Sequence, residues 1–309
     1  MRGAASLLAV LAALAAAGCG LGPGAQREGG GATLRVTRDF GRELLSSATV
    51  GKVREDQTVL RLLRSRNKVK TRYGGGFVQS IDGLSGQGQS GFADWFYYVN
   101  GLEADKGAAQ YELTPGDIVQ WDYRNWRETM DVRATVGAFP EPFLHGLEGR
   151  RFPTRVECED AVSRACKTVK RNLDEAGVPA TGAALGAPGT QEVARVVVAT
   201  WQRARELPTV RALEDEAGES GVFARFRDGG RKLELLDERG EVADTAGADT
   251  GLVAARRPSD TEILWVVTGG DQRGLDAAVR VFEADTLRDA FAVAATPDGP
   301  RDLPLESTR

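Results

Sequence analysis

Between residues 74 and 126 the chain alternates short β-rich runs with tight-turn signals, and this pattern limits the fold more than any other feature. The runs are GGGFVQSIDGLSG, DWFYYVNG and GDIVQWDYRNW, each bounded by glycine, Asn-Gly or Pro-Gly-Asp. Such runs suit strands joined by tight turns. Upstream, residues 33–40 and 44–50 predict two strands, and residues 59–67 predict a helix capped by Asp56. This order predicts a β-grasp-like α+β domain over 32–127.

The aromatic residues of these strands are the candidate binding residues. With a period of two, Trp95 and Tyr97 point to one face of their strand and Tyr98 to the other, while Trp121 and Tyr123 share a face. So many rings in a small domain suit either a thick core or an exposed flat platform that receives a planar ligand or a partner. On the second interpretation the candidate ligand-binding residues are Trp95, Tyr98, Trp121 and Tyr123.

A series of short motifs follows the same strands in order. The series is Gly76-Phe77-Val78, Ser80-Ile81-Asp82-Gly83, residues 95–98, Val99-Asn100-Gly101, Gly107, Tyr111-x-Leu113 and Gly116-Asp117-x-Val119-x-Trp121-x-Tyr123. It resembles the transcobalamin C-terminal-like domain. That resemblance implies a compact β-grasp-like module, which in transcobalamin and intrinsic factor covers one face of bound cobalamin. Cobalamin is therefore the ligand that the resemblance implies, and no cofactor is required.

The start of the chain determines the expected compartment. An apolar run, residues 7–17, follows Met1 and Arg2 and ends in LAALAAAGCG, which resembles the lipobox of bacterial lipoproteins. We expect a lipoprotein signal peptide over 1–18, lipidation of Cys19 and a flexible tether over 19–31. No later run approaches the ~20 apolar residues of a membrane span, so the expected location is the extracytoplasmic face of a membrane, held by lipid. The alternative is an ordinary secretory signal, with Cys19 incidental.

The second half of the chain predicts a further α+β domain over 132–295, followed by a tail over 296–309. Its signals are an amphipathic helix from Asp160 to Gly177, a hairpin over 222–242, a buried strand EILWVVTG and a helix after it. Cys158 and Cys166 form either a disulfide or two buried free thiols. A disulfide requires Cys158 to lie in the turn before a helix capped by Asp160, because eight residues of continuous helix separate Cα atoms by about 12 Å.

Composition excludes several classes of chemistry. The 309 residues include one histidine, His145, and 40 basic against 44 acidic residues, a net charge of -4. We therefore expect no nucleic-acid partner, no metal site and no enzymatic activity, since no known catalytic motif occurs. Residues 61–72 carry six positive residues and no acidic one. They form either a solvated face or a surface for anionic lipid headgroups.

Two functional hypotheses follow. In the first, a membrane-anchored lipoprotein binds a small, cobalamin-like molecule for capture or uptake without catalysis, and its second domain orients the first or contacts a transporter subunit. In the second, a structural or adhesion lipoprotein uses its aromatic strands to bind another protein or an envelope polymer.

Overall fold

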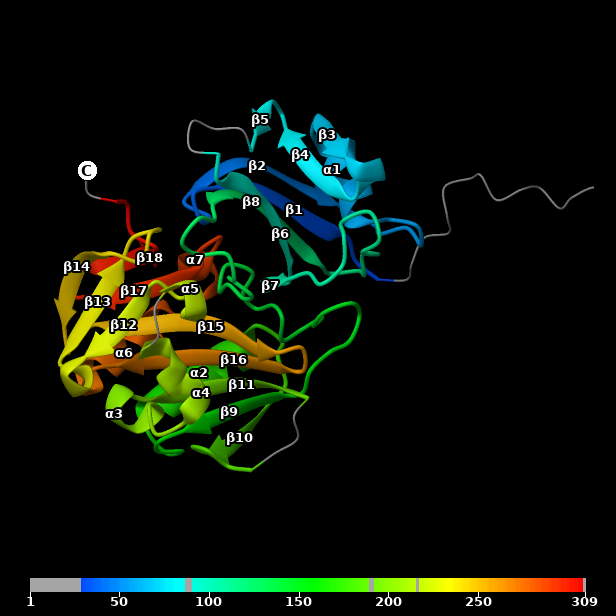
Figure 1. Cartoon of the computed structure of the whole chain (residues 1–309). Coiled ribbons are helices and arrows are strands. Elements are labelled where there is room, and N and C mark those ends of the chain that lie inside the picture. Colours follow the sequence, from blue (N-terminus) through cyan, green and yellow to red (C-terminus); the bar gives the residue numbers. More distant parts are fainter. Residues whose placement is uncertain (1–28, 87–90, 189–191, 215–216, 308–309) are drawn as a thin grey trace, which may run out of the picture.

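The protein has an α+β architecture with two domains, seen in a computed structural model that describes residues 29–86, 91–188, 192–214 and 217–307 (Figure 1). The expected signal peptide, Cys19 and most of the expected tether lie outside these residues. The N-terminal domain contains β1 (Ala32–Arg38), β2 (Glu43–Val50), α1 (Val59–Arg66), β3 (Val69–Arg72), β4 (Phe77–Ile81), β5 (Leu84–Ser85), β6 (Ala93–Val99), β7 (Leu102–Glu103) and β8 (Ile118–Asn125). Among these residues, no helix is long and apolar enough to cross a membrane.

The N-terminal domain is built on a five-stranded sheet in the order β2-β1-β8-β6-β7, with β1 and β8 parallel. The helix α1 covers one face of this sheet through Leu62 and Leu63, which are fully buried with Val36 and Trp121. A small sheet, β3-β4-β5, lies beside α1 on the same side (Figure 1). Strands around one covering helix confirm the expected α+β arrangement.

The helix α1 begins at Val59 as expected, but its cap is a different residue. Thr58, rather than Asp56, is the N-cap residue, and its hydroxyl accepts a hydrogen bond from the Arg61 backbone N–H at 3.2 Å. The Asp56 carboxylate instead pairs with the Arg61 side chain. Aspartate and threonine are both good cap residues. Thr58 holds the position because a helix that begins directly after it turns its apolar stripe toward the sheet.

The C-terminal domain is built on a seven-stranded sheet in the order β10-β9-β11-β16-β15-β17-β18, and a separate sheet pairs β12-β13-β14. Its elements are β9 (Thr154–Cys158), α2 (Arg164–Glu175), β10 (Ala180–Ala184), β11 (Val193–Thr200), α3 (Trp201–Ala204), α4 (Pro208–Arg211), α5 (Ala217–Ser220), β12 (Ala224–Arg227), β13 (Lys232–Leu236), β14 (Val242–Gly247), β15 (Gly251–Ser259), β16 (Glu262–Gly269), α6 (Gln272–Val281), α7 (Ala284–Leu287), β17 (Ala292–Thr296) and β18 (Gly299–Leu303). The expected 222–242 hairpin is present as β12 and β13. The expected tail is wrong in part, because β18 completes the sheet and Leu303 is buried.

Cys158 and Cys166 form a disulfide, with their Cα atoms 5.9 Å apart. Cys158 ends β9, and Cys166 lies in the first turn of α2, so the chain leaves the strand and enters the helix between them. The cap of α2 is Ser163, whose hydroxyl accepts from the Cys166 backbone N–H; Asp160 was expected in this place. Asp160 instead accepts from the Val162 backbone N–H in the preceding turn.

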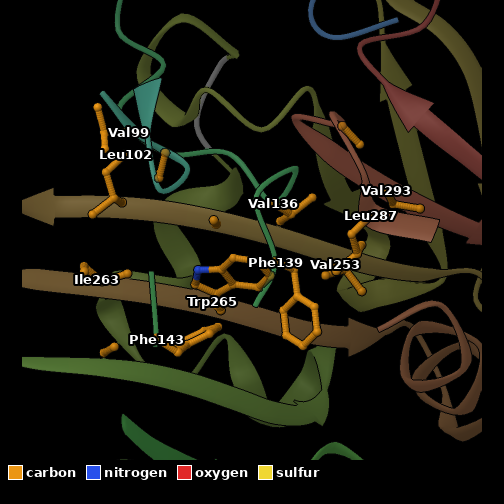
Figure 2. Packing of buried hydrophobic residues seen from close by; sticks show 14 of the residues in the cluster. Val99, Leu102, Val136, Phe139, Phe143, Val253, Ile263, Trp265, Leu287 and Val293 are labelled. Carbon is orange, nitrogen blue, oxygen red and sulfur yellow. The ribbon is translucent and has the colours of Figure 1, made fainter. Parts of the chain in front are cut away.

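The segment joining the domains contains no strand between residues 126 and 153. It is nevertheless packed: Phe139 and Phe143 lie against Trp265 of β16, with the Phe143 and Trp265 ring centroids 5.1 Å apart (Figure 2). Aromatic rings at this spacing add to the stability that their burial supplies. The connection is therefore part of the C-terminal core.

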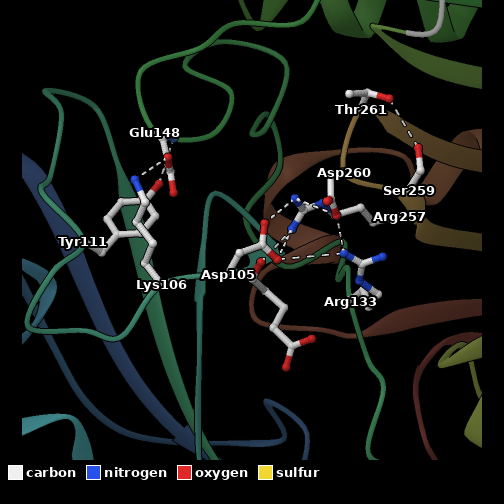
Figure 3. A network of polar contacts seen from close by, with 10 residues as sticks. Asp105, Lys106, Tyr111, Arg133, Glu148, Arg257, Ser259, Asp260 and Thr261 are labelled. Carbon is white, nitrogen blue, oxygen red and sulfur yellow. Dashed lines mark hydrogen bonds and ion pairs between the residues drawn. The ribbon is translucent and has the colours of Figure 1, made fainter.

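The second face of the five-stranded sheet packs on the C-terminal domain. Arg35 of β1 donates to the Asp289 carboxylate at 3.0 Å, and the Gln120 side chain donates to the Asp289 carbonyl at 3.1 Å. A second polar contact joins Asp105 to Arg257 of β15, at 2.6 Å, beside Arg133 (Figure 3). Apolar and charged contacts together hold the two domains against each other.

Candidate functional site

Of the two interpretations of the aromatic strands, a thick core or an exposed platform, the structure shows the core. Trp95, Tyr98 and Trp121 are 6%, 0% and 2% exposed, and Tyr123 is half-buried. Trp121 stacks on Tyr97 at 5.0 Å between ring centroids, beneath α1, whereas Tyr98 packs on Phe291 of the C-terminal domain. The period-two assignment of faces was correct, but both faces of the sheet are covered. These rings form core, so three of the four cannot stack directly on a ligand.

Two of the four residues instead hold the small sheet in place. The Trp95 indole N–H donates to the Leu84 carbonyl at 3.1 Å, and the Tyr123 hydroxyl donates to the Ser85 carbonyl at 2.8 Å. Leu84 and Ser85 are the two residues of β5. Trp95 and Tyr123 therefore position the hairpin β4–β5 by its backbone.

Among the residues described in this domain, two aromatic residues are exposed, and both adjoin the turn that leads into β4. Tyr73 is 85% exposed and Phe77 is 37% exposed. They flank a groove of about 590 Å³, lined by Arg72, Tyr73, Phe77, Gln79, Gly86, Gly91 and Asp94. A concave surface with aromatic walls and a few polar groups is the usual form of a small-molecule site. Residues 87–90, between Gly86 and Gly91, lie outside the described part of the chain.

A tight turn between β3 and β4 creates one wall of the groove. Residues Tyr73–Gly75 form a 3-10 turn, closed by a hydrogen bond from the Gly76 N–H to the Tyr73 carbonyl at 3.2 Å. Gly75 has φ +101°, which L side chains rarely adopt, and Tyr73 has φ 52°. A bulky residue in this region is uncommon and costs about 1 kcal/mol or more. The glycine run therefore forms a turn that projects Tyr73 outward.

The polar groups of the groove carry opposite charges. Arg72 is exposed and lies directly across from Phe77 in the β3–β4 ladder. Asp94, at the start of β6, is partly buried; burial raises the pKa of its carboxyl, against the hydrogen bond that the Trp126 indole donates at 3.2 Å. A Cβ at Gly86 would lie 2.2 Å from the Asp94 carboxylate, so glycine is required there. The groove thus offers a cation, a carboxyl and two rings.

His145, the single histidine, lies away from this groove. Its Nδ1 is 2.5 Å from a carboxylate oxygen of the buried Glu141, in the segment joining the domains. Burial raises the pKa of Glu141, while the His145 hydrogen bonds oppose that shift. Within residues 29–86, 91–188, 192–214 and 217–307, no three His, Cys, Asp or Glu side chains gather as a metal site.

A comparison with protein families falls on the same part of the chain. Residues 56–125 match the model of a family described as a domain of unknown function (DUF4430). This match spans α1 to β8 and includes every residue that lines the groove. No curated protein matches the chain. One similar solved structure is a protein from Ruminococcus gnavus described as a candidate metal-binding protein, 16% identical over 31% of this chain and 97% of that one, with a TM-score of 0.25.

Sequence reasoning missed Tyr73 and Asp94 as site residues. The glycine run 74–76 stands between two aromatic residues, Tyr73 and Phe77. Two aromatic residues on either side of a tight turn are the sequence feature from which a groove at this turn could have been predicted. No pattern in the neighbouring sequence marks Asp94 as a site residue. It lines the same groove as Arg72 only because β4 pairs with β5 and β6 packs beside them.

Proposed function

We propose that the protein is a lipid-anchored extracytoplasmic lipoprotein that binds a small molecule in the groove beside Tyr73 and Phe77, without chemical conversion. The observation that carries this proposal is the groove itself. Two exposed rings, the Arg72 guanidinium and the Asp94 carboxyl line this groove, within the segment that matches a family of unknown function. Aromatic faces bind planar apolar groups, and the two charged side chains orient polar substituents.

The resemblance to the transcobalamin C-terminal-like domain makes cobalamin the first ligand to test. The groove is open on one side and suits contact with one face of a large planar molecule. Capture at the cell surface would then deliver the ligand to a transporter subunit. The rival hypothesis, adhesion through the aromatic strands, requires exposed rings, but Trp95, Tyr98 and Trp121 are buried.

The proposal is tested by titration of the mature chain, residues 19–309 with Cys19→Ser, against cobalamin and cobinamide. Heat and tryptophan fluorescence are followed together, and saturable binding is expected. Phe77→Ala removes one aromatic wall and is expected to weaken affinity about 3- to 10-fold, the value of a single stacking contact.

Met130→Ala serves as the matched control, because Met130 is an exposed apolar residue outside the groove. Equal affinities of the Phe77→Ala protein and the unsubstituted chain would remove the groove as the site. Absence of heat with both corrinoids would remove cobalamin as the ligand.

A further inference from the structure

A dense set of positive side chains begins at Arg72, which lines the groove, and continues back along β3 to the end of α1. They are Arg64, Arg66, Lys68, Lys70 and Arg72, and all five are exposed; we call this set the basic face. The last turn of α1 leads directly into β3, and the Arg64 side chain donates to the Thr71 hydroxyl at 2.9 Å. The end of the helix and the strand that follows it therefore carry five cations within a short stretch of chain.

Most of the charge on the basic face is not neutralised by the described residues. Among them, Arg66, Lys68, Lys70 and Arg72 form no ion pair, whereas the neighbouring Arg61 pairs with Asp56. The nearby Asp82 carboxylate accepts from the Asn67 side chain at 2.6 Å and from the Lys68 backbone N–H at 2.7 Å. A cluster of this kind creates a local positive potential on a chain whose net charge is -4.

The position of the basic face leaves it accessible in the two-domain molecule. In Figure 1, α1, β3 and β4 lie on the side of the five-stranded sheet that is remote from the C-terminal domain. The opposite face of that sheet is the one that Asp289 and Phe291 contact. A flat surface can therefore approach the basic face without meeting the second domain.

We propose that the basic face docks on an anionic lipid bilayer, with Tyr73 at the headgroup level. Lys and Arg beside an exposed amphipathic ring is the combination that binds anionic membrane surfaces. Since the rest of the chain carries excess negative charge, docking also selects one orientation. Arg72 belongs both to the basic face and to the lining of the groove, so docking brings the groove close to the bilayer.

This inference extends the proposed function through the expected lipid on Cys19. Residues 19–31 span at most about 45 Å when extended, so the tether keeps β1 close to the bilayer. A lipid chain together with a basic surface is the two-signal arrangement that gives stable membrane association. The docking itself requires no lipid on the protein and is testable without it.

The experiment uses residues 19–309 with Cys19→Ser and vesicles of phosphatidylcholine, alone or mixed with phosphatidylglycerol. Co-sedimentation is expected only with the mixed vesicles, and it should fall steeply as salt is raised. Lys68→Glu with Lys70→Glu is expected to lower the partition coefficient at least about 25-fold, because each cation near an anionic surface contributes about a 5-fold factor. Neither lysine lines the groove.

The matched control is Lys167→Glu with Lys170→Glu on α2, an equal change of net charge at two exposed residues of the C-terminal domain. Its partition coefficient should stay within about 2-fold. Equal binding to neutral and mixed vesicles, or equal loss in both double variants, would overturn the docking surface. Corrinoid titration of the Lys68→Glu/Lys70→Glu protein separates the two proposals: because neither lysine lines the groove, its corrinoid affinity should be unchanged while its vesicle binding falls.

Discussion

Glu157 shows at the scale of one residue how burial and charge pairing compete. Its carboxylate on β9 is fully buried, and it accepts hydrogen bonds from the side chains of Arg195 at 2.8 Å and Arg155 at 2.6 Å. Burial alone would raise its pKa. The two guanidinium groups outweigh burial and lower the pKa below the ordinary value of 4.5.

Glu157→Gln is expected to destabilise the protein by about 3 kcal/mol at neutral pH, because it breaks a buried ion pair and leaves two arginines short of a partner. A lowered folded-state pKa means that the carboxylate stabilises the fold above pH 4.5. That stabilisation is lost as the pH falls through the folded-state pKa. Urea unfolding of both proteins at a series of pH values measures this difference.

Glu192→Gln is the matched control, since Glu192 pairs with Arg150 on the surface and both side chains are more than half exposed. Its effect should stay within about 0.5 kcal/mol. A constant difference between the unsubstituted chain and the Glu157→Gln protein down to low pH would contradict the assigned charge state.

At the scale of elements, local sequence predicted the kind of element better than its ends. The strand β6, the helix α1 and the hairpin β12–β13 lie where alternation, apolar stripe and turn residues placed them. The caps of α1 and α2 were assigned to aspartates at 56 and 160, but hydroxyl residues at 58 and 163 hold those positions. Several suitable cap residues precede each helix, and tertiary packing selects one register.

Thr58→Ala tests that selection. The substitution removes the oxygen that accepts from the Arg61 N–H, and it should cost about 1 kcal/mol of unfolding free energy. Asp56→Ala removes only an exposed ion pair and should cost less than about 0.5 kcal/mol. Denaturant unfolding of the two variants decides between them, and the reverse order of effects would restore Asp56 as the cap.

At the scale of the whole molecule, the two domains share apolar cores. One cluster joins Tyr98 and Phe40 of the first domain to Phe291 and Leu252 of the second. The Phe40 and Phe291 ring centroids are 5.3 Å apart. Residues that lie 190 or more positions apart in the chain are thus buried against each other, and the domains should unfold together.

Phe291→Ala is expected to cost about 3 to 5 kcal/mol, because it leaves a cavity between the domains. Calorimetry should show one unfolding transition in the unsubstituted chain, and the substitution should move the whole transition to lower temperature. Two transitions, only one of which moves, would mean that the domains unfold independently.

The sequence by itself determined the local features. These are the runs that form strands, the side chains that share a face of β6 or of β8, and the start of each helix to within one turn. It also limited Cys158 and Cys166 to a disulfide across a strand-to-helix turn or two free thiols, and the structure contains the disulfide. These features depend on contacts between near neighbours, which periodicity and turn residues encode.

Only the tertiary structure decided which aromatic rings are buried. Tyr98 is covered by Phe291, and Trp121 by α1 and Tyr97, so these rings form core and not an exposed platform. The exposed rings are Tyr73 and Phe77, beside a turn. A strand pattern states that two faces differ, but burial depends on the elements that cover each face. Phe291, which covers Tyr98, lies nearly two hundred residues further along the chain, so no pattern within one strand could predict this contact.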